Sequence, residues 1–183
     1  MRDTEFIRDK VPMTKEEVRA ISLSKLSLGN ANSLLDVGAG TGSVGLQAAF
    51  EYPDLEVLGI EQKEIAVDLI LKNKTKFNLS NYQVTLGKAP IELRQSFDRI
   101  FIGGSGGNLA EIIDWSYSSL TDEGILVLNF ILIENALEAM RELEKSKFKE
   151  LEMVQVGIGD WTKLGKGHYF KPQNQTLIIS CQK

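Results

Sequence analysis

The chain has 183 residues, 43% of them hydrophobic, and its 21 Lys and Arg against 25 Asp and Glu give a net charge of −4. These values predict one domain, residues 1–183, with a proper core, and they argue against a nucleic-acid-binding protein, which usually presents a basic face. One cysteine, one histidine, a charged N-terminus and no long apolar run exclude a disulfide framework, a metal site of these residues and a membrane span, so we expect a cytoplasmic protein.

The first motif in chain order is PMTKEEVRA, residues 12–20. Thr14 followed by Glu17 has the spacing of a capping box, in which the Thr side chain caps a helix and the Glu side chain returns the hydrogen bond. Capping is the role that we expect from the sequence alone, although Thr14 could also face a ligand.

Strand-like and helix-like segments alternate along the chain. Five short, mostly apolar segments, four of which end in Gly or a polar residue, have the pattern of buried parallel strands: residues 33–38, 56–61, 82–87, 98–103 and 124–130. Two helical stripes lie between them, the first over roughly residues 62–78 and the second over roughly residues 132–148. The first stripe consists of Ala66, Leu69, Ile70 and Phe77, and the second consists of Ile133, Ala136, Leu137, Met140 and Leu143.

The C-terminal part breaks this alternation. Residues 151–159 and 176–182 are strand candidates with a loop but no helix between them, so we expect an antiparallel pair at one edge of the sheet. The predicted fold is therefore α/β, a doubly wound, mostly parallel, seven-stranded sheet with an antiparallel C-terminal edge hairpin. This outline is Rossmann-like.

A glycine-rich loop, LLDVGAGTGSVG, follows the first of these strands and opens a helix. Its glycines permit a tight turn and a close approach of the backbone to a ligand. Residues 40–45 formally match the dinucleotide fingerprint, whereas residues 36–42 match the S-adenosylmethionine loop of class I methyltransferases. Asp36 favours the second reading, because a carboxylate would repel a pyrophosphate but attract the sulfonium and ammonium groups of S-adenosylmethionine. The candidate loop residues are Gly38, Ala39, Gly40, Thr41 and Gly42.

Two further cofactor positions follow the next strands. Glu61 ends the second strand about twenty residues beyond the glycine loop, where an acidic residue accepts hydrogen bonds from the ribose hydroxyls of an adenosine. A carboxylate there could instead complement the dipole of the next helix. Ala89, in the turn after the third strand, is the candidate for contact with the adenine ring.

The fourth strand runs into IFIGGSGGNLAE, a loop nearly free of side chains. Its glycines leave space for a wide, flat substrate, and its backbone N–H groups together with the following helix N-terminus can hold an anion such as a carboxylate. The candidate substrate residues are Gly103, Gly104, Ser105 and Gly106. Methyl transfer needs mainly alignment of donor and acceptor, so the catalytic residues stay unknown.

Together, PMTKEEVRA, DVGAGTGSVG, the AP turn, IFIGGSGG and LVLN resemble the precorrin C-15 methyltransferase/decarboxylase family of cobalamin biosynthesis, in its stand-alone, anaerobic-route form. The resemblance implies S-adenosylmethionine-dependent methylation of C-15 of cobalt-precorrin-6B, a tetrapyrrole rich in carboxylates, with decarboxylation of its C-12 acetate. It also implies that Thr14 contacts the cofactor and that the protein is a homotetramer.

Three alternatives remain open beside this reading: a methyltransferase of the same fold that acts on RNA or on an isoaspartyl carboxylate, a non-catalytic protein that binds S-adenosylmethionine, and an NAD-dependent oxidoreductase. Candidate helpers for decarboxylation occur in WTKLGKGHYF, namely Lys163, Lys166, His168 and Tyr169. A surface or loop position is the expected role of each, and we assign none of them to catalysis.

Overall fold

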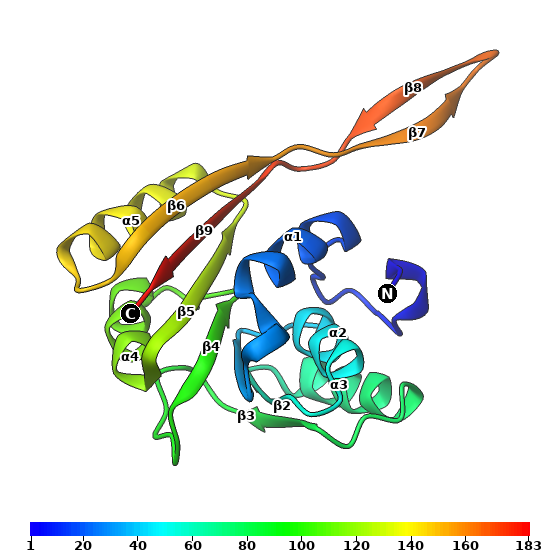
Figure 1. The fold of residues 1–183 in the computed structure, drawn as a ribbon. Helices are drawn as coiled ribbons and strands as arrows, with labels where there is room; N and C mark the ends of the chain where they lie inside the picture. The colour runs from blue at the N-terminus through cyan, green and yellow to red at the C-terminus, as the bar shows by residue number, and fades with distance from the viewer.

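The computed structural model describes residues 1–183, and its body is a layered α/β fold from which one long arm projects (Figure 1). The helices are α1 (Glu16–Leu26), α2 (Ser43–Glu51), α3 (Glu64–Lys76), α4 (Leu109–Ser119) and α5 (Ile133–Lys145). The strands are β1 (Ser33–Val37), β2 (Glu56–Glu61), β3 (Tyr82–Leu86), β4 (Phe97–Ile102), β5 (Leu120–Phe130), β6 (Lys149–Val156), β7 (Gly159–Leu164), β8 (Gly167–Pro172) and β9 (Thr176–Gln182). No helix is both long enough and apolar enough to cross a membrane.

The central sheet has seven strands in the order β3-β2-β1-β4-β5-β9-β6. The strands from β3 to β5 pair in parallel, and β9 runs antiparallel to both of its neighbours, β5 and β6. This arrangement confirms the predicted seven-stranded sheet with an antiparallel C-terminal pair. The chain order reverses between β1 and β4, and ligands bind in the crevice that such a reversal leaves at the carboxyl ends of the strands.

Helices cover both faces of the sheet and define two cores. Helices α1, α2 and α3 pack on one face through a cluster that includes Val18, Leu46 and Ile70, and α4 and α5 pack on the other. The alternation of side chains along a strand feeds both cores: in β1, Leu34 belongs to the first cluster, whereas Leu35 belongs to the second.

Helix α1 begins at Glu16, and the predicted capping box at its start is wrong. Lys15 occupies the N-cap position, and no side chain there forms a capping hydrogen bond. The carbonyl of Thr14 instead accepts a hydrogen bond of 2.6 Å from Nη1 of Arg19, one helical turn later. The Thr14 side chain is therefore not used by the helix.

Arg19 is fully buried and holds the N-terminal segment against the body. Its guanidinium donates to Oε1 of Gln47 at 2.5 Å, to Oδ1 of Asp3 at 3.1 Å and to the carbonyl of Met1 at 2.7 Å. A buried arginine with all of its nitrogens paired fixes geometry because leaving any of them unpaired is costly. The segment before α1 is thus an ordered part of the fold.

Helix α5 is rotated relative to the predicted stripe. Ala136 and Leu143 are buried as expected, but Ile133 and Leu137 are exposed. The helix packs through Ala136, Ala139 and Leu143, whose spacing of three and four residues forms a narrow buried face. Ile133 and Leu137 lie on the adjacent stripe, and a sequence pattern cannot distinguish two neighbouring apolar stripes on one helix.

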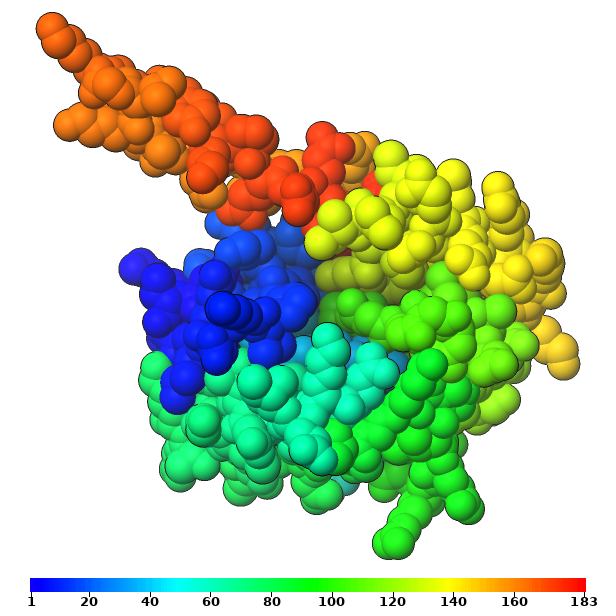
Figure 2. All heavy atoms as spheres, turned by 180° about the vertical axis from the view of Figure 1, so that it is seen from behind, coloured from blue at the N-terminus to red at the C-terminus, as the bar shows by residue number.

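The loop that we expected between the last two strands of the sheet is instead a β-hairpin, the β7–β8 arm (residues 159–172). Its strands pair only with each other, and the arm extends away from the body in both views (Figures 1 and 2). All of the β8 residues are exposed. The four candidate helpers for decarboxylation, which we call the tail residues, lie on this arm: Lys163, Lys166, His168 and Tyr169.

Candidate functional site

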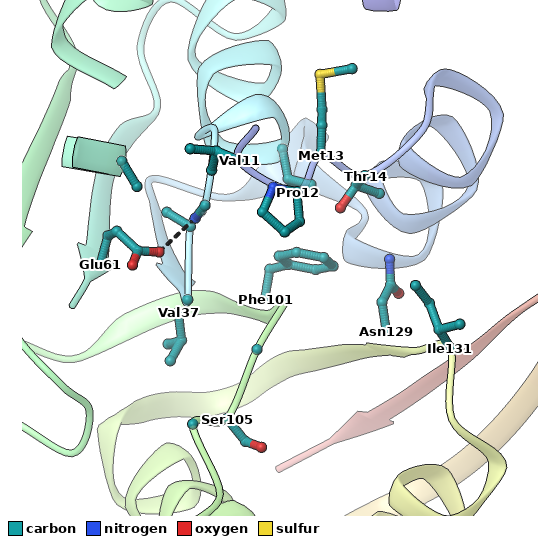
Figure 3. Close-up of a pocket in the computed structure, with 18 of the residues that line it drawn as sticks. Val11, Pro12, Met13, Thr14, Val37, Glu61, Phe101, Ser105, Asn129 and Ile131 are labelled. Atoms are coloured by element: carbon teal, nitrogen blue, oxygen red, sulfur yellow. Dashed lines mark hydrogen bonds between the residues drawn. The ribbon is translucent and has the colours of Figure 1, made fainter. Parts of the chain in front are cut away.

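A cavity of about 700 Å³ opens at the carboxyl edge of the sheet (Figure 3). It is lined by the ends of β1, β2, β4 and β5, by residues 11–15 before α1, and by Pro172, Gln173 and Asn174 at the base of the arm. This is the position where open α/β sheets bind ligands, and the volume is typical of small-molecule sites.

The glycine loop forms one wall of this cavity. Gly38, Ala39 and Gly40 line it, whereas Thr41 and Gly42 do not. Thr41 is buried, and a Cβ atom at Gly42 would point toward Ile70 in the core. Gly38, Gly40 and Gly42 adopt φ angles of 68°, 58° and 72°, a conformation that side chains disfavour. The five predicted loop residues therefore divide into three that face the cavity and two that shape the turn.

Glu61 connects this loop to the next helix. Its Oε2 accepts a hydrogen bond from the N–H of Gly40 at 2.8 Å (Figure 3). Its Oε1 accepts one from the N–H of Lys63 at 2.9 Å, just before α3. Glu61 can therefore interact with the start of α3 and also bind ribose hydroxyls. A carboxylate has about four acceptor positions, and two remain for a ligand. Glu61 lines the cavity.

Asp36 does not face the cavity, contrary to the electrostatic argument made from the sequence. It lies beneath the loop, where its Oδ2 accepts a hydrogen bond from the N–H of Gly45 at 3.0 Å and its Oδ1 has no partner. Burial raises the pKa of Asp36 to about 7, the Gly45 hydrogen bond opposes this, and the charge of Glu61 adds to it. Glu61 is therefore the carboxylate available to a ligand.

The turn after β3 brings Ala89 to the cavity. Ala89 lines the cavity, and its carbonyl accepts a hydrogen bond of 2.9 Å from Nδ2 of Asn108, the N-cap residue of α4. The small side chain leaves room beside it, and the hydrogen bond fixes the turn against the loop that follows β4.

All four predicted substrate residues, Gly103 to Gly106, line the cavity. A Cβ atom at Gly104 would have no heavy atom within 4 Å, so the space over this loop is open. A Cβ atom at Gly106 would lie 3.3 Å from the side chain of Lys88, which therefore reaches over the loop. The bare loop is thus accompanied by a cation that the sequence reasoning did not select.

The cavity has an excess of positive charge. Glu61 is the sole acidic residue among those that line it, whereas Lys15, Lys63 and Lys88 all line it. Lys15 pairs with Asp3 at 3.4 Å, but the other two lysines form no salt bridge. In a chain with a net charge of −4, this local excess favours an anionic ligand.

The far end of the cavity contains residues that the sequence reasoning missed. These residues are Phe101, Asn129 and Ile131. In Figure 3 they border the same space as Thr14, a predicted cofactor contact, and all four line the cavity. Thr14 thus reaches the site, whereas none of the four tail residues on the β7–β8 arm does. One signal was available for Asn129: it is an amide near the end of an otherwise apolar strand.

Comparison with known protein sequences finds relatives over nearly the whole chain. A family profile described as a precorrin methyltransferase domain matches residues 4–183. The cobalt-precorrin-6B C(15)-methyltransferase (decarboxylating) of Salmonella typhimurium is 45% identical over 184 residues, which cover 100% of this chain and 96% of that protein. A probable enzyme of the same name from Saccharolobus solfataricus is 38% identical, over 99% of this chain and 94% of the relative.

Solved structures agree with the sequence comparisons. A precorrin-6y C5,15-methyltransferase from Geobacter metallireducens superposes with a TM-score of 0.92 at 34% identity, covering 100% of this chain and 96% of that one. A precorrin 8W decarboxylase from Methanobacterium thermoautotrophicum gives a TM-score of 0.89 at 28% identity, covering 99% and 98%. A tRNA (m1A58) methyltransferase from Aquifex aeolicus, at 19% identity and a TM-score of 0.74, shares the fold alone.

Proposed function

Because the chain belongs to the precorrin methyltransferase family, we propose that it methylates C-15 of cobalt-precorrin-6B and removes the carboxyl group of the C-12 acetate. One observation carries this proposal. A single cavity joins the glycine loop and Glu61 at one end to the bare loop and the base of the arm at the other, so that a methyl donor and a large acceptor have adjoining places.

The residues at the first end fit S-adenosylmethionine. Gly38 and Gly40 allow the cofactor to approach the backbone, and Glu61 retains two acceptor positions for its ribose hydroxyls. We further assign the adenine contact to Ala89 and a contact with the amino-acid end to Thr14. When bound, the cofactor supplies a methyl group on a positively charged sulfur. Thr41 and Gly42 hold the loop in shape from behind.

The second end fits a flat, polyanionic acceptor. Gly103, Gly104, Ser105 and Gly106 leave open space over the carboxyl end of β4, and Lys88 supplies positive charge beside it. Several carboxylates on one tetrapyrrole would reach both Lys88 and the backbone N–H groups of the loop. The chain's own residues therefore act mainly by binding and alignment, which can supply much of the rate acceleration in a methyl transfer.

The test is incubation of the purified protein with labelled S-adenosylmethionine and cobalt-precorrin-6B, followed by mass spectrometry of the tetrapyrrole. We expect a product that has gained one methyl group and lost carbon dioxide. The metal-free precorrin, assayed in parallel, reports whether the cobalt is required. Binding of S-adenosylmethionine without turnover of either tetrapyrrole would contradict the proposal and favour another methyl acceptor.

We also propose that the protein assembles as a homotetramer through the β7–β8 arm. Trp161 and Phe170 are 65% and 67% exposed on this arm, and an isolated two-stranded hairpin is marginally stable in water. Docking against other copies would cover these side chains. Light scattering should give a tetramer for the natural chain and a smaller species for the double variant Trp161→Ser/Phe170→Ser; an unchanged mass would exclude the arm as the interface.

The single cysteine is compatible with the cytoplasmic location that we propose. Cys181 is buried and unpaired, and burial raises the pKa of its thiol to about 12, so it stays protonated.

A further inference from the structure

Asn129 lies near the carboxyl end of β5 as the polar member of an otherwise apolar strand segment. The β4–β5 register pairs Ile102 with Leu128, so Asn129 lies opposite Gly103, the first residue of the bare loop. Its side chain lines the cavity together with Phe101 and Thr14 (Figure 3). The amide therefore borders the first residue of the bare loop, over which we have placed the acceptor, and lies near Thr14, which we have assigned to the cofactor.

The amide is held from behind by helix α1. Nδ2 of Asn129 donates a hydrogen bond to Oγ of Ser22 at 2.8 Å, and Ser22 in turn donates to the carbonyl of Val18 at 2.8 Å. Oδ1 of Asn129 lies 3.3 Å from the same hydroxyl. Ser22 is fully buried, so this support is shielded from water. Because Ser22 donates its hydroxyl proton to Val18, its oxygen acts as an acceptor toward Asn129, which favours the nitrogen as the nearer end of the amide.

One Nδ2–H of Asn129 is left without a protein partner, because an amide nitrogen carries two hydrogens and Ser22 takes one. The residues beside it in Figure 3 are apolar or uncharged: Phe101, Ile131 and Thr14 border the same space. A donor in surroundings of low polarity binds an anion more strongly than it would in water. A carboxylate is the group that this position suits.

We propose that Asn129 binds a carboxylate side chain of the tetrapyrrole and that Ser22 is the positioning residue which holds its amide in the binding orientation. This proposal rests on the proposed function and adds a specificity-determining residue to it. Asn129 lies on β5, whereas Lys88 follows β3 on the other side of β2, β1 and β4, so that the acceptor is held at two separated points and its ring is aligned over the bare loop.

The decisive variant is Asn129→Asp, which keeps the shape of the side chain but replaces the donor by a negative charge. We expect the KM for cobalt-precorrin-6B to rise about tenfold or more at pH 8, because a hydrogen bond to a charged group is lost and a repulsion is added. Affinity for S-adenosylmethionine, measured by calorimetry, should stay within about twofold. As the pH is lowered and the new acid is protonated, it becomes a donor again and the KM should recover.

Asn30→Asp, which adds the same charge at an exposed site before β1, is the matched control and should show neither effect. Asn129→Ala adds no charge and should raise the KM at every pH. Ser22→Ala should raise the KM less than Asn129→Ala does, and this increase should vanish when Asn129 is already alanine, because a support has no effect once its target is gone.

An unchanged KM in both Asn129 variants, with the natural chain active, would overturn the role of Asn129 and leave the proposed function intact. An equal loss of S-adenosylmethionine affinity would assign the residue to the cofactor instead. A Ser22→Ala effect of the same size in both backgrounds would overturn the positioning role. A natural chain that does not convert the tetrapyrrole is a failure of the proposed function, and it is detected before any variant is compared.

Discussion

The backbone of Gly104 lies directly against Cα of Gly38, so that a Cβ atom at position 38 would come within 2.5 Å of the Gly104 carbonyl oxygen. The glycine loop after β1 and the bare loop after β4 therefore contact each other through main chain alone. Gly38 also has a φ angle of 68°. This contact joins the proposed cofactor end of the cavity to the proposed substrate end.

Gly38→Ala should disturb both loops at once. Strain at a positive φ angle and the clash with Gly104 should lower the free energy of unfolding by about 2 kcal/mol or more and weaken S-adenosylmethionine binding. Thermal denaturation and calorimetry measure the two effects. Gly29→Ala is the control, because nothing lies within 4 Å of its added Cβ atom. A stable Gly38→Ala variant with normal affinity would show that the loops can separate without consequence.

Gly104→Val separates the two ends of the site. The added side chain would point into open space, so the fold and S-adenosylmethionine affinity should be preserved. The KM for the tetrapyrrole should rise about tenfold or more, because the valine occupies the space over the bare loop. Gly29→Val provides a matched substitution outside the cavity. Turnover at the natural rate and KM would remove the loop from the substrate site.

Glu61→Ala should raise the Kd for S-adenosylmethionine by about tenfold to a hundredfold, because hydrogen bonds to a charged group are lost. The N–H groups of Gly40 and Lys63 would lose their acceptor at the same time. Glu56→Ala, at the exposed opposite end of the same strand, should leave the Kd unchanged. Calorimetry distinguishes the two variants, and equal affinities would exclude Glu61 from the cofactor site.

Asp36 should make stability depend on pH. Its pKa is raised from 3.8 to about 7 in the folded protein, so the folded state binds the proton more tightly than the unfolded state does. The contribution of Asp36 to the free energy of unfolding is fully present below about pH 4. It is lost as the pH rises toward 7, by about 1.4 kcal/mol per pH unit. Above this range no further loss is expected, because both states are then ionised.

Asp36→Asn removes this titration. The melting temperature of the variant, relative to the natural chain, should increase by several degrees between pH 5 and pH 8. The opposite trend, or a difference that is constant with pH, would show that Asp36 is ionised in the folded protein throughout this range.

Arg19→Met should release the segment that carries Thr14. Methionine fills much of the volume but removes the hydrogen bonds from the Arg19 guanidinium to Asp3 and Gln47, which should lower the free energy of unfolding by about 3 kcal/mol. Cleavage by a non-specific protease should appear before Glu16, and S-adenosylmethionine affinity should fall. Arg141→Met, on the exposed face of α5, is the control. If the variant is cleaved no faster than the natural chain, contacts other than those of Arg19 hold this segment in place.

The positions of most sheet strands along the chain were predictable because these strands are short, apolar and separated by glycine or polar turns. The same holds for the glycine loop, whose turn requires residues that tolerate positive φ angles, and for Glu61, whose place at the end of a parallel strand brings it to the carboxyl edge. These features depend on local pattern and on rules of strand connection. The sequence by itself therefore determined the fold class and the edge at which the cavity opens.

Only the tertiary structure decided which polar side chains reach that cavity. Asp36 and Glu61 both lie near the carboxyl ends of strands, but Asp36 points beneath the loop toward Gly45, whereas Glu61 lines the cavity. Asn129 acquires its fixed orientation from Ser22, which is 107 residues away in the chain. Such assignments depend on the packing of a helix against a strand, and no local pattern encodes a contact between two segments that meet only in the folded chain.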